Sequence, residues 1–259
     1  MKLIHSRNNA RFKALHRLAT STRERRKAGL TLLDGVHLIA AYHAAVGAVE
    51  QLILSEARSG NKEIASLVSA TDENRVLVLS DQLFNDVAQV ATPTGVMALV
   101  LTPQSGALPE QIENCVMLEN IQDAGNLGSI LRSAAAAGVN TLLLSPGCVF
   151  AWSPKVLRAG MGSHFSLDVH ENVDLLAIVP RLRGNLVMTG SHARKSIYEA
   201  DLRGPLSWVF GNEGSGVSAA LAGAATEQLR IPMSGDIESL NVAAAAAVCL
   251  FEQVRQRPG

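Results

Sequence analysis

The sequence predicts an α/β fold in two parts, and three observations support this prediction. Short apolar runs typical of strands alternate with helical patterns along the chain. In the C-terminal part these runs are apolar throughout, as expected of parallel strands that are buried on both faces. Three of them lead into a polar loop and then a helix. We therefore predict a small N-terminal α/β domain and a C-terminal Rossmann-like parallel sheet, with ligands at the carboxyl ends of its strands.

The N-terminal domain is predicted over residues 1–101, and a linker over residues 102–112 because this segment contains Pro, Gly and Ser. Leu15, Leu18 and Ala19 recur at helical spacing in the first helix. The expected helices are 8–27, 36–46, 62–70 and 81–90, and the expected strands are 30–35, 49–54, 75–79 and 96–101.

The C-terminal domain is predicted over residues 113–259. The alanine run 243–247 favours a helix that other backbone can approach closely. Ser239 and Asn241 precede this run and carry oxygens of the kind that cap a first turn. The expected strands are 115–118, 141–144, 186–189, 207–210 and 229–231, and the expected helices are 126–137, 155–160, 173–183, 216–221 and 242–255.

The net charge of zero conceals a basic N-terminal arm. Residues 1–27 hold nine Lys and Arg residues and one acidic residue, Glu24. Such an arm favours a polyanionic partner, although a solvated helix face is the ordinary alternative. Phe12 is the only Phe, Tyr or Trp in the arm, so we expect phosphate contacts rather than base stacking. The residues predicted to contact such a partner are Arg7, Arg11, Lys13, Arg25 and Arg26.

Other classes of protein are disfavoured. No apolar run is long enough to span a membrane, and the N-terminus lacks a secretory apolar region, so we expect a cytoplasmic protein. The three cysteines and seven histidines are dispersed, which argues against a disulfide framework and a metal site. The sequence contains neither a P-loop nor a G-x-S-x-G motif.

Three stretches, residues 118–138, 208–218 and 229–252, resemble in order and spacing the three motifs of the SpoU/TrmH RNA ribose 2′-O-methyltransferases. The resemblance covers the chain from about residue 115 onward. It implies an S-adenosylmethionine-dependent methyl transfer to a ribose 2′-hydroxyl without a metal, a C-terminal trefoil knot and a homodimer. It also implies that the N-terminal domain is a ribosomal-protein-like, RNA-binding extension.

Asn126 and Arg132 belong to the first motif and lie six residues apart at the start of a helix, so both project near one side of it. By resemblance Asn126 shapes the site and Arg132 lies closest to the reacting hydroxyl. A guanidinium holds its proton above about pH 12. We therefore expect Arg132 to orient the 2′-hydroxyl and its phosphate, and to stabilise developing alkoxide charge. Lys155 and Arg158 are further candidates for phosphate contact.

The second and third motifs supply the other predicted site residues. Glu213 is the acid of the second motif, and we expect it to pair with Arg132 across the site. The glycine spacing of this loop differs from a dinucleotide fingerprint, which excludes a nicotinamide cofactor. By resemblance, Ser239 and Asn241 form a catalytic polar pair. The predicted cofactor contacts are Gly211, Ile231 and Leu240, with Thr189 at the end of the strand 186–189 and Gly190 after it.

We predict an RNA 2′-O-methyltransferase and favour rRNA over tRNA as its substrate, because the N-terminal extension resembles a ribosomal-protein fold. A tRNA 2′-O-methyltransferase and a catalytically silent RNA-binding module are the alternatives. A methyltransferase for small molecules or proteins, and an rRNA methylase that confers antibiotic resistance, are also compatible with the motifs.

Overall fold

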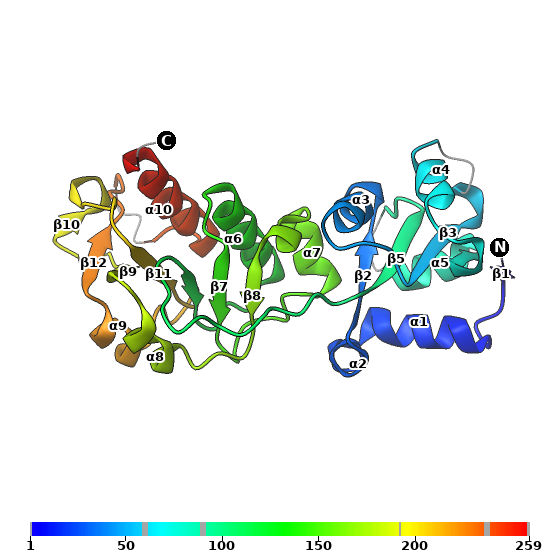
Figure 1. The fold of residues 1–259 in the computed structure, drawn as a ribbon, viewed down its shortest axis with the longest axis horizontal. Helices are drawn as coiled ribbons and strands as arrows, with labels where there is room; N and C mark the ends of the chain where they lie inside the picture. The colour runs from blue at the N-terminus through cyan, green and yellow to red at the C-terminus, as the bar shows by residue number, and fades with distance from the viewer. Residues whose placement is uncertain (1, 59–61, 89–91, 192, 236–238, 258–259) are drawn as a thin grey trace. The chain divides into compact units, whose positions relative to one another are not determined.

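The computed structural model describes residues 2–58, 62–88, 92–191, 193–235 and 239–257 (Figure 1). Its contacts divide the chain into two compact units. The first comprises Met1–Gln104 and Trp152–Phe165, and the second comprises Ser105–Ala151 and Ser166–Gly259. Residues 152–165 therefore pack with the first unit. The domain boundaries expected from the sequence, with a linker at 102–112, stay a prediction.

The first unit is built on a mixed sheet in the order β1-β4-β3-β5-β2. β1, β4 and β3 are parallel, and β5 runs antiparallel to both β3 and β2. Its strands are β1 (Lys2–Ile4), β2 (Leu30–Asp34), β3 (Gln51–Ser55), β4 (Val76–Leu79) and β5 (Val96–Leu101). Its helices are α1 (Ala10–Thr20), α2 (Thr22–Ala28), α3 (Val36–Ala45), α4 (Lys62–Ser69), α5 (Asp81–Ala88) and α7 (Pro154–Gly160).

Helices α1 and α5 share one core with the sheet. Phe12 and Leu15 of α1 and Phe84 of α5 are buried together with Leu32 and Ile53 from the strands. Helix α7 is tied to β2: the Thr31 hydroxyl donates to the Trp152 carbonyl, and Arg158 forms an ion pair with Asp34 (3.0 Å). Arg158 is thus engaged within the first unit.

The second unit contains a sheet in the order β10-β12-β9-β11-β6-β7-β8, and all of its pairings are parallel. This confirms the predicted parallel sheet. Its strands are β6 (Val116–Leu118), β7 (Thr141–Leu144), β8 (Asp168–His170), β9 (Asn185–Thr189), β10 (Lys195–Ser196), β11 (Leu206–Phe210) and β12 (Glu227–Arg230). Its helices are α6 (Ala124–Ala136), α8 (Leu175–Ile178), α9 (Ala219–Ala224) and α10 (Val242–Gln256).

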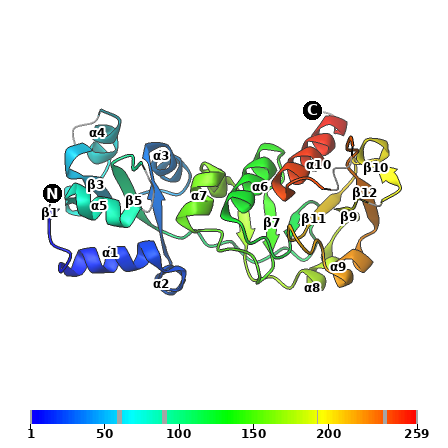
Figure 2. The same cartoon turned by 180° about the vertical axis from the view of Figure 1, so that it is seen from behind.

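Helices cover both faces of this sheet. α6 and α10 pack side by side on one face, and α8 and α9 lie on the other (Figure 1, Figure 2). Leu175 and Ile178 of α8 and Leu221 of α9 pack with Met117 and Val209 from the strands. On the opposite face, Trp208 is buried and its indole N–H donates to Gln253 of α10 (2.9 Å). Burial on both faces explains the apolar strands.

Several predicted elements were wrong in their extent. The helix expected at 8–27 breaks at Ser21, which has extended dihedrals and caps α2 through its hydroxyl. The helix expected at 173–183 shortens to α8 and a 3₁₀ turn, because Pro180 lacks the N–H needed to continue it. The helix expected at 216–221 begins later, since Gly216 has a φ of 68° and Ser218 provides the cap.

Strands β1, β8 and β10 were not predicted from the sequence because each is short and none forms an apolar run. The trefoil knot and the ribosomal-protein-like character of the first unit stay predictions. No helix among the described residues is long and apolar enough to cross a membrane.

Candidate functional site

The candidate site lies at the carboxyl ends of four adjacent strands of the second unit, in the order β12-β9-β11-β6. Carboxyl ends of parallel strands meet at one edge of a sheet. The ends of these strands and the loops and helices that follow them carry the predicted catalytic and cofactor residues, listed by strand: Asn126 and Arg132 after β6, Thr189 at the end of β9 and Gly190 after it, Gly211 and Glu213 after β11, and Ile231, Ser239, Leu240 and Asn241 after β12.

A chain of hydrogen bonds joins one residue from each of the three motifs. Asn241 Nδ2 donates to Asn126 Oδ1 (2.9 Å), and Asn126 Nδ2 donates to Glu213 Oε1 (2.6 Å). These residues are 115 and 87 positions apart in the sequence. The predicted convergence of Asn126, Glu213 and Asn241 is therefore present in the fold.

The direction of this chain is set by the start of α10. Asn241 caps the helix, and its Oδ1 accepts from the backbone N–H groups of Ala243 (2.9 Å) and Ala244 (3.3 Å). Its amide nitrogen must then point outward and donate to Asn126. The Asn126 nitrogen is left to face the Glu213 carboxylate, which only accepts when ionised. Each amide thus has one orientation that satisfies its partners.

Helix α6 begins two residues before Asn126, at which the expected helix 126–137 started. The cap is Asp123, whose carboxylate accepts from the Asn126 backbone N–H (2.8 Å). Asn126 is the third residue of the helix, and its side chain is consequently free to bridge Glu213 and Asn241. An Asn that caps a helix and an Asn that links two other side chains both occur near the start of a helical pattern. The sequence pattern alone therefore does not show which of these two roles Asn126 has.

The loop that carries Glu213 is held in shape by Asn212. Asn212 Oδ1 accepts from the N–H groups of Gly214 (2.9 Å) and Ser215 (3.2 Å), and its Nδ2 donates to the Asn120 carbonyl (3.0 Å). Sequence reasoning missed Asn212, although an Asn followed two residues later by Gly is a signal for such a turn. Asn120 was also missed; it adopts a left-handed φ of 56°, which Asn tolerates better than most residues.

Gly211 is required by packing at the base of the same loop. A Cβ built on Gly211 would lie 2.2 Å from the Gly216 carbonyl carbon and 2.4 Å from the Val217 nitrogen. Two backbone segments therefore pass each other where only glycine fits. Gly211 does not line the pocket described next.

A pocket of about 170 Å³ lies beside these motifs. Ser191, Met233 and Ala245 line it in addition to residues predicted from the sequence. The structure thus gathers five of the predicted site residues in its wall: Thr189, Gly190, Ile231, Ser239 and Leu240. Its apolar surfaces with a few hydroxyl groups are typical of small-molecule sites.

Arg132 is exposed on α6 and makes no hydrogen bond or ion pair with the described residues. The ion pair expected between Arg132 and Glu213 is accordingly wrong, since Glu213 accepts from Asn126 instead. Six residues of helix separate Asn126 from Arg132, a rise of about 9 Å, and the nearer side chain meets the carboxylate. The Arg132 guanidinium is left available for an anion.

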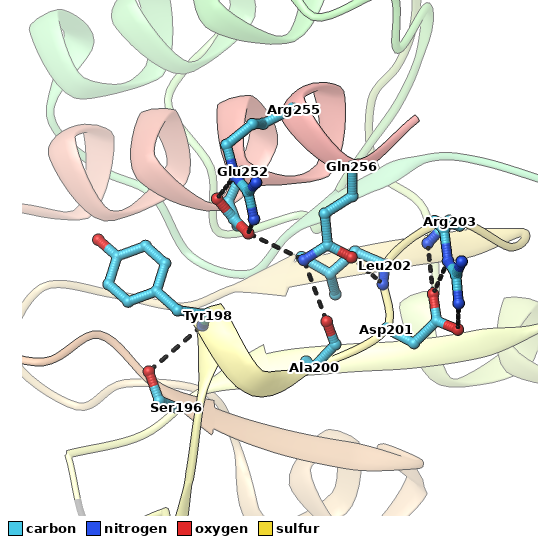
Figure 3. A network of polar contacts seen from close by, with 9 residues as sticks. All are labelled: Ser196, Tyr198, Ala200, Asp201, Leu202, Arg203, Glu252, Arg255 and Gln256. Atoms are coloured by element: carbon cyan, nitrogen blue, oxygen red, sulfur yellow. Dashed lines mark hydrogen bonds and ion pairs between the residues drawn. The ribbon is translucent and has the colours of Figure 1, made fainter. Parts of the chain in front are cut away.

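Helix α10, which positions Asn241, is anchored at its far end (Figure 3). Gln256 accepts from the Leu202 N–H (2.9 Å) and donates to the Ala200 carbonyl (3.0 Å) and to Glu252 (2.8 Å). Glu252 forms an ion pair with Arg255 (2.7 Å). These contacts tie the last turn to the 200–202 segment.

The residues of the basic arm differ in their exposure. Arg11, Lys13 and Arg26 are exposed, and Arg7 is exposed while ion-paired with Asp86 (2.8 Å). Arg25 is different, as it is only 5% exposed. Its guanidinium donates to the carbonyls of residues 18 (2.6 Å) and 19 (2.9 Å), which satisfies the C-terminal end of α1. This burial removes Arg25 from the predicted RNA-contacting set.

Comparison with known proteins agrees with this geometry. The SpoU rRNA methylase family model matches residues 113–251, and an MRM3-like substrate-binding domain model matches residues 9–98. An uncharacterised tRNA/rRNA methyltransferase of Synechocystis is 34% identical over 98% of this chain and 94% of its own length. The 23S rRNA (guanosine(2553)-2′-O)-methyltransferase RlmP of Bacillus subtilis is 29% identical over 97% of this chain and 98% of its own.

Solved structures agree as well. The crystal structure of an RNA 2′-O ribose methyltransferase superposes with a TM-score of 0.83 at 32% identity, covering 98% of both chains. The SpoU methyltransferase AviRb of Streptomyces viridochromogenes, in complex with AdoMet, superposes with a TM-score of 0.81 at 28% identity, covering 96% of this chain and 98% of its own. The chain belongs to the SpoU rRNA methylase family.

Proposed function

We propose that this chain transfers a methyl group from S-adenosylmethionine to a ribose 2′-hydroxyl of ribosomal RNA. The observation that carries the proposal is the hydrogen-bonded chain from Asn241 through Asn126 to Glu213, which unites three motifs beside a pocket. Ribosomal RNA is favoured over tRNA because RlmP and other relatives are named as rRNA methyltransferases.

The pocket suits part of the cofactor. Ile231, Met233 and Leu240 offer apolar surface, and Thr189 and Ser239 offer hydroxyls. S-adenosylmethionine supplies an electrophilic methyl group on a sulfonium when bound. The pocket volume of about 170 Å³ is below the roughly 300–1,000 Å³ of sites that enclose a drug-sized ligand. We therefore expect these residues to hold one portion of the cofactor.

Arg132 acts on the nucleophile in this proposal. Its exposed, unpaired guanidinium can donate to the ribose 2′-oxygen and to the neighbouring phosphate, aligning the hydroxyl for attack. As the hydroxyl loses its proton, the fixed positive charge stabilises the alkoxide. Glu213, held by Asn126, does not neutralise this charge. The adjacent phosphate is the proposed proton acceptor, because the guanidinium itself stays protonated.

The test is Arg132→Ala, with Arg203→Ala as a matched control, because Arg203 is exposed and lies outside the site. Arg132→Ala should abolish tritiated-methyl incorporation into RNA and leave S-adenosylmethionine affinity by calorimetry nearly unchanged. The Arg203→Ala control should keep both methyl incorporation and cofactor affinity. Loss of cofactor affinity in Arg132→Ala would contradict the role given to this residue.

Substrate choice is tested in the same assay with separate rRNA and tRNA. Incorporation into rRNA alone supports the proposal, whereas tRNA alone would favour the tRNA enzyme. Cofactor and RNA binding without incorporation would indicate the silent RNA-binding module. Activity that survives RNase would point to a small-molecule or protein substrate.

A homodimer, a C-terminal trefoil knot and a cytoplasmic location complete the proposal as expectations from the family. Phe251 (48% exposed) and Val254 (40% exposed) on α10 support the homodimer, because a partner would cover them. Sedimentation at micromolar concentration should give a dimer. A fully active monomer would refute this part.

A further inference from the structure

A groove of about 700 Å³ lies along α1 in the first unit, and nothing in the methyl-transfer proposal uses it. Its wall includes Lys13, His16 and Arg17 of α1, Arg7 before that helix and Asp86 of α5. Its volume falls within the roughly 300–1,000 Å³ of small-molecule sites, which is sufficient for a nucleotide.

The charges in the groove are unevenly distributed. Arg7 is neutralised by Asp86, with Nε–Oδ2 and Nη2–Oδ2 distances of 2.9 and 2.8 Å. Lys13 and Arg17 lie four residues apart on one helix face and make no ion pair or hydrogen bond through their side chains with other described residues. Phosphate is therefore favoured near Lys13 and Arg17 and disfavoured near the Asp86 carboxylate.

An aromatic ring, His16, lines the same groove as the two free cations. The His16 ring is half-buried and packs against the Phe12 ring, with centroids 5.9 Å apart and planes tilted by 40°. Phe12 is only 4% exposed and supports His16 from the core. A supported flat ring with cations in the same groove is an arrangement on which an unpaired base stacks while its phosphates meet the cations.

We propose that this groove binds one unpaired nucleotide of the RNA substrate, with its base against His16 and its flanking phosphates on Lys13 and Arg17. This inference rests on the proposed function and adds that the RNA is recognised at a single-stranded loop or bulge. Bases stacked within a duplex cannot reach the ring. It also revises the expectation that the arm makes phosphate contacts only.

The phosphate contacts are tested by Lys13→Gln/Arg17→Gln in the full-length protein. The control Arg23→Gln/Lys27→Gln removes the same charge from exposed positions on α2, outside the groove. Binding of a fluorescent RNA single strand is measured against salt. The groove variant should lower the slope of log affinity against log salt by about 1.4, because each phosphate contact contributes about 0.7. The control should lower it by much less. An equal decrease of the slope in both variants would mean that the basic residues attract RNA without a defined site, and would overturn the proposed groove site.

The base contact is tested by His16→Ala, with His16→Phe as the conservative variant. His16→Ala should weaken single-strand binding about tenfold without changing the salt slope, because stacking involves no ion release. His16→Phe should retain affinity. Binding of an RNA duplex should be the same for all three proteins. A His16→Ala variant that binds the single strand normally, or that weakens the duplex equally, would overturn the inference.

Failure of this inference is distinguishable from failure of the proposed function. A wild-type protein that methylates RNA, with groove variants that bind it normally, would contradict the groove alone. A wild-type protein that neither binds nor methylates RNA would contradict the proposed function and the inference with it.

Discussion

The amide chain at the candidate site makes a sharp prediction about Asn126. Asn126→Asp replaces the nitrogen that donates to Glu213 with a carboxylate oxygen, while its other oxygen can still accept from Asn241. Two carboxylates would then face each other where a 2.6 Å hydrogen bond now exists. Adding Glu213→Gln supplies a donor in the opposite direction and should restore the contact.

The size of the effect follows from this geometry. A hydrogen bond to a charged group contributes about 1.5–3 kcal/mol, and the lower end applies because Glu213 is exposed. Repulsion between unit charges 4 Å apart costs about 1 kcal/mol in water and about 4 kcal/mol near a protein surface. We therefore expect Asn126→Asp to lose about 2.5 kcal/mol of unfolding free energy, about 1.5 from the hydrogen bond and about 1 from the repulsion. The double variant should recover about 1–2 kcal/mol relative to the sum of the single changes.

Urea unfolding of the wild type, both single variants and the double variant gives the coupling energy directly. Methyl transfer by the four proteins is measured in parallel, with cofactor affinity as the control for pocket integrity. A coupling energy below about 0.3 kcal/mol would be within the error of additivity and would refute the reasoning. It would mean that Asn126 and Glu213 are neighbours without a stabilising contact.

Three further predictions concern packing and burial. Gly211→Ala should abolish cofactor binding, because its Cβ would lie 2.2 Å from backbone, whereas Gly223→Ala, with open space around it, should be neutral by calorimetry. Burial raises the pKa of Asp34 and Arg158 opposes this, so Arg158→Gln should raise that pKa further. Near pH 3 the Asp34 carboxyl is protonated in the folded and unfolded states, so the variant should lose little unfolding free energy relative to the wild type. The loss should grow to about 1–2 kcal/mol as the pH rises through the folded-state pKa of Asp34. Urea midpoints at several pH values check this, and a deficit independent of pH would contradict it. Arg25→Met should lower the unfolding free energy by about 1–3 kcal/mol, because two carbonyls at the end of α1 lose their donor, and should leave the salt dependence of RNA binding unchanged.

The sequence by itself determined the parallel sheet of the second unit and the loops that carry its candidate site residues. Short apolar strands predicted a parallel sheet buried on both faces, and the loop after each strand marked where polar residues gather. The motif resemblance implied one shared site for Asn126, Glu213 and Asn241, and parallel strands place the loops that carry them at one edge of the sheet. The resemblance of three motifs to the SpoU/TrmH family identified the chain's family correctly.

Only the tertiary structure decided which of these side chains meet. Glu213 accepts from Asn126 rather than Arg132, because about 9 Å of helix separates the two candidates and hydrogen bonds act over about 3 Å. Arg25 looked like its basic neighbours in sequence, yet a helix break at Ser21 turned it inward to satisfy carbonyls. Local patterns specify which face or edge a residue occupies, whereas contacts between residues some 90 to 115 positions apart depend on how separate elements pack.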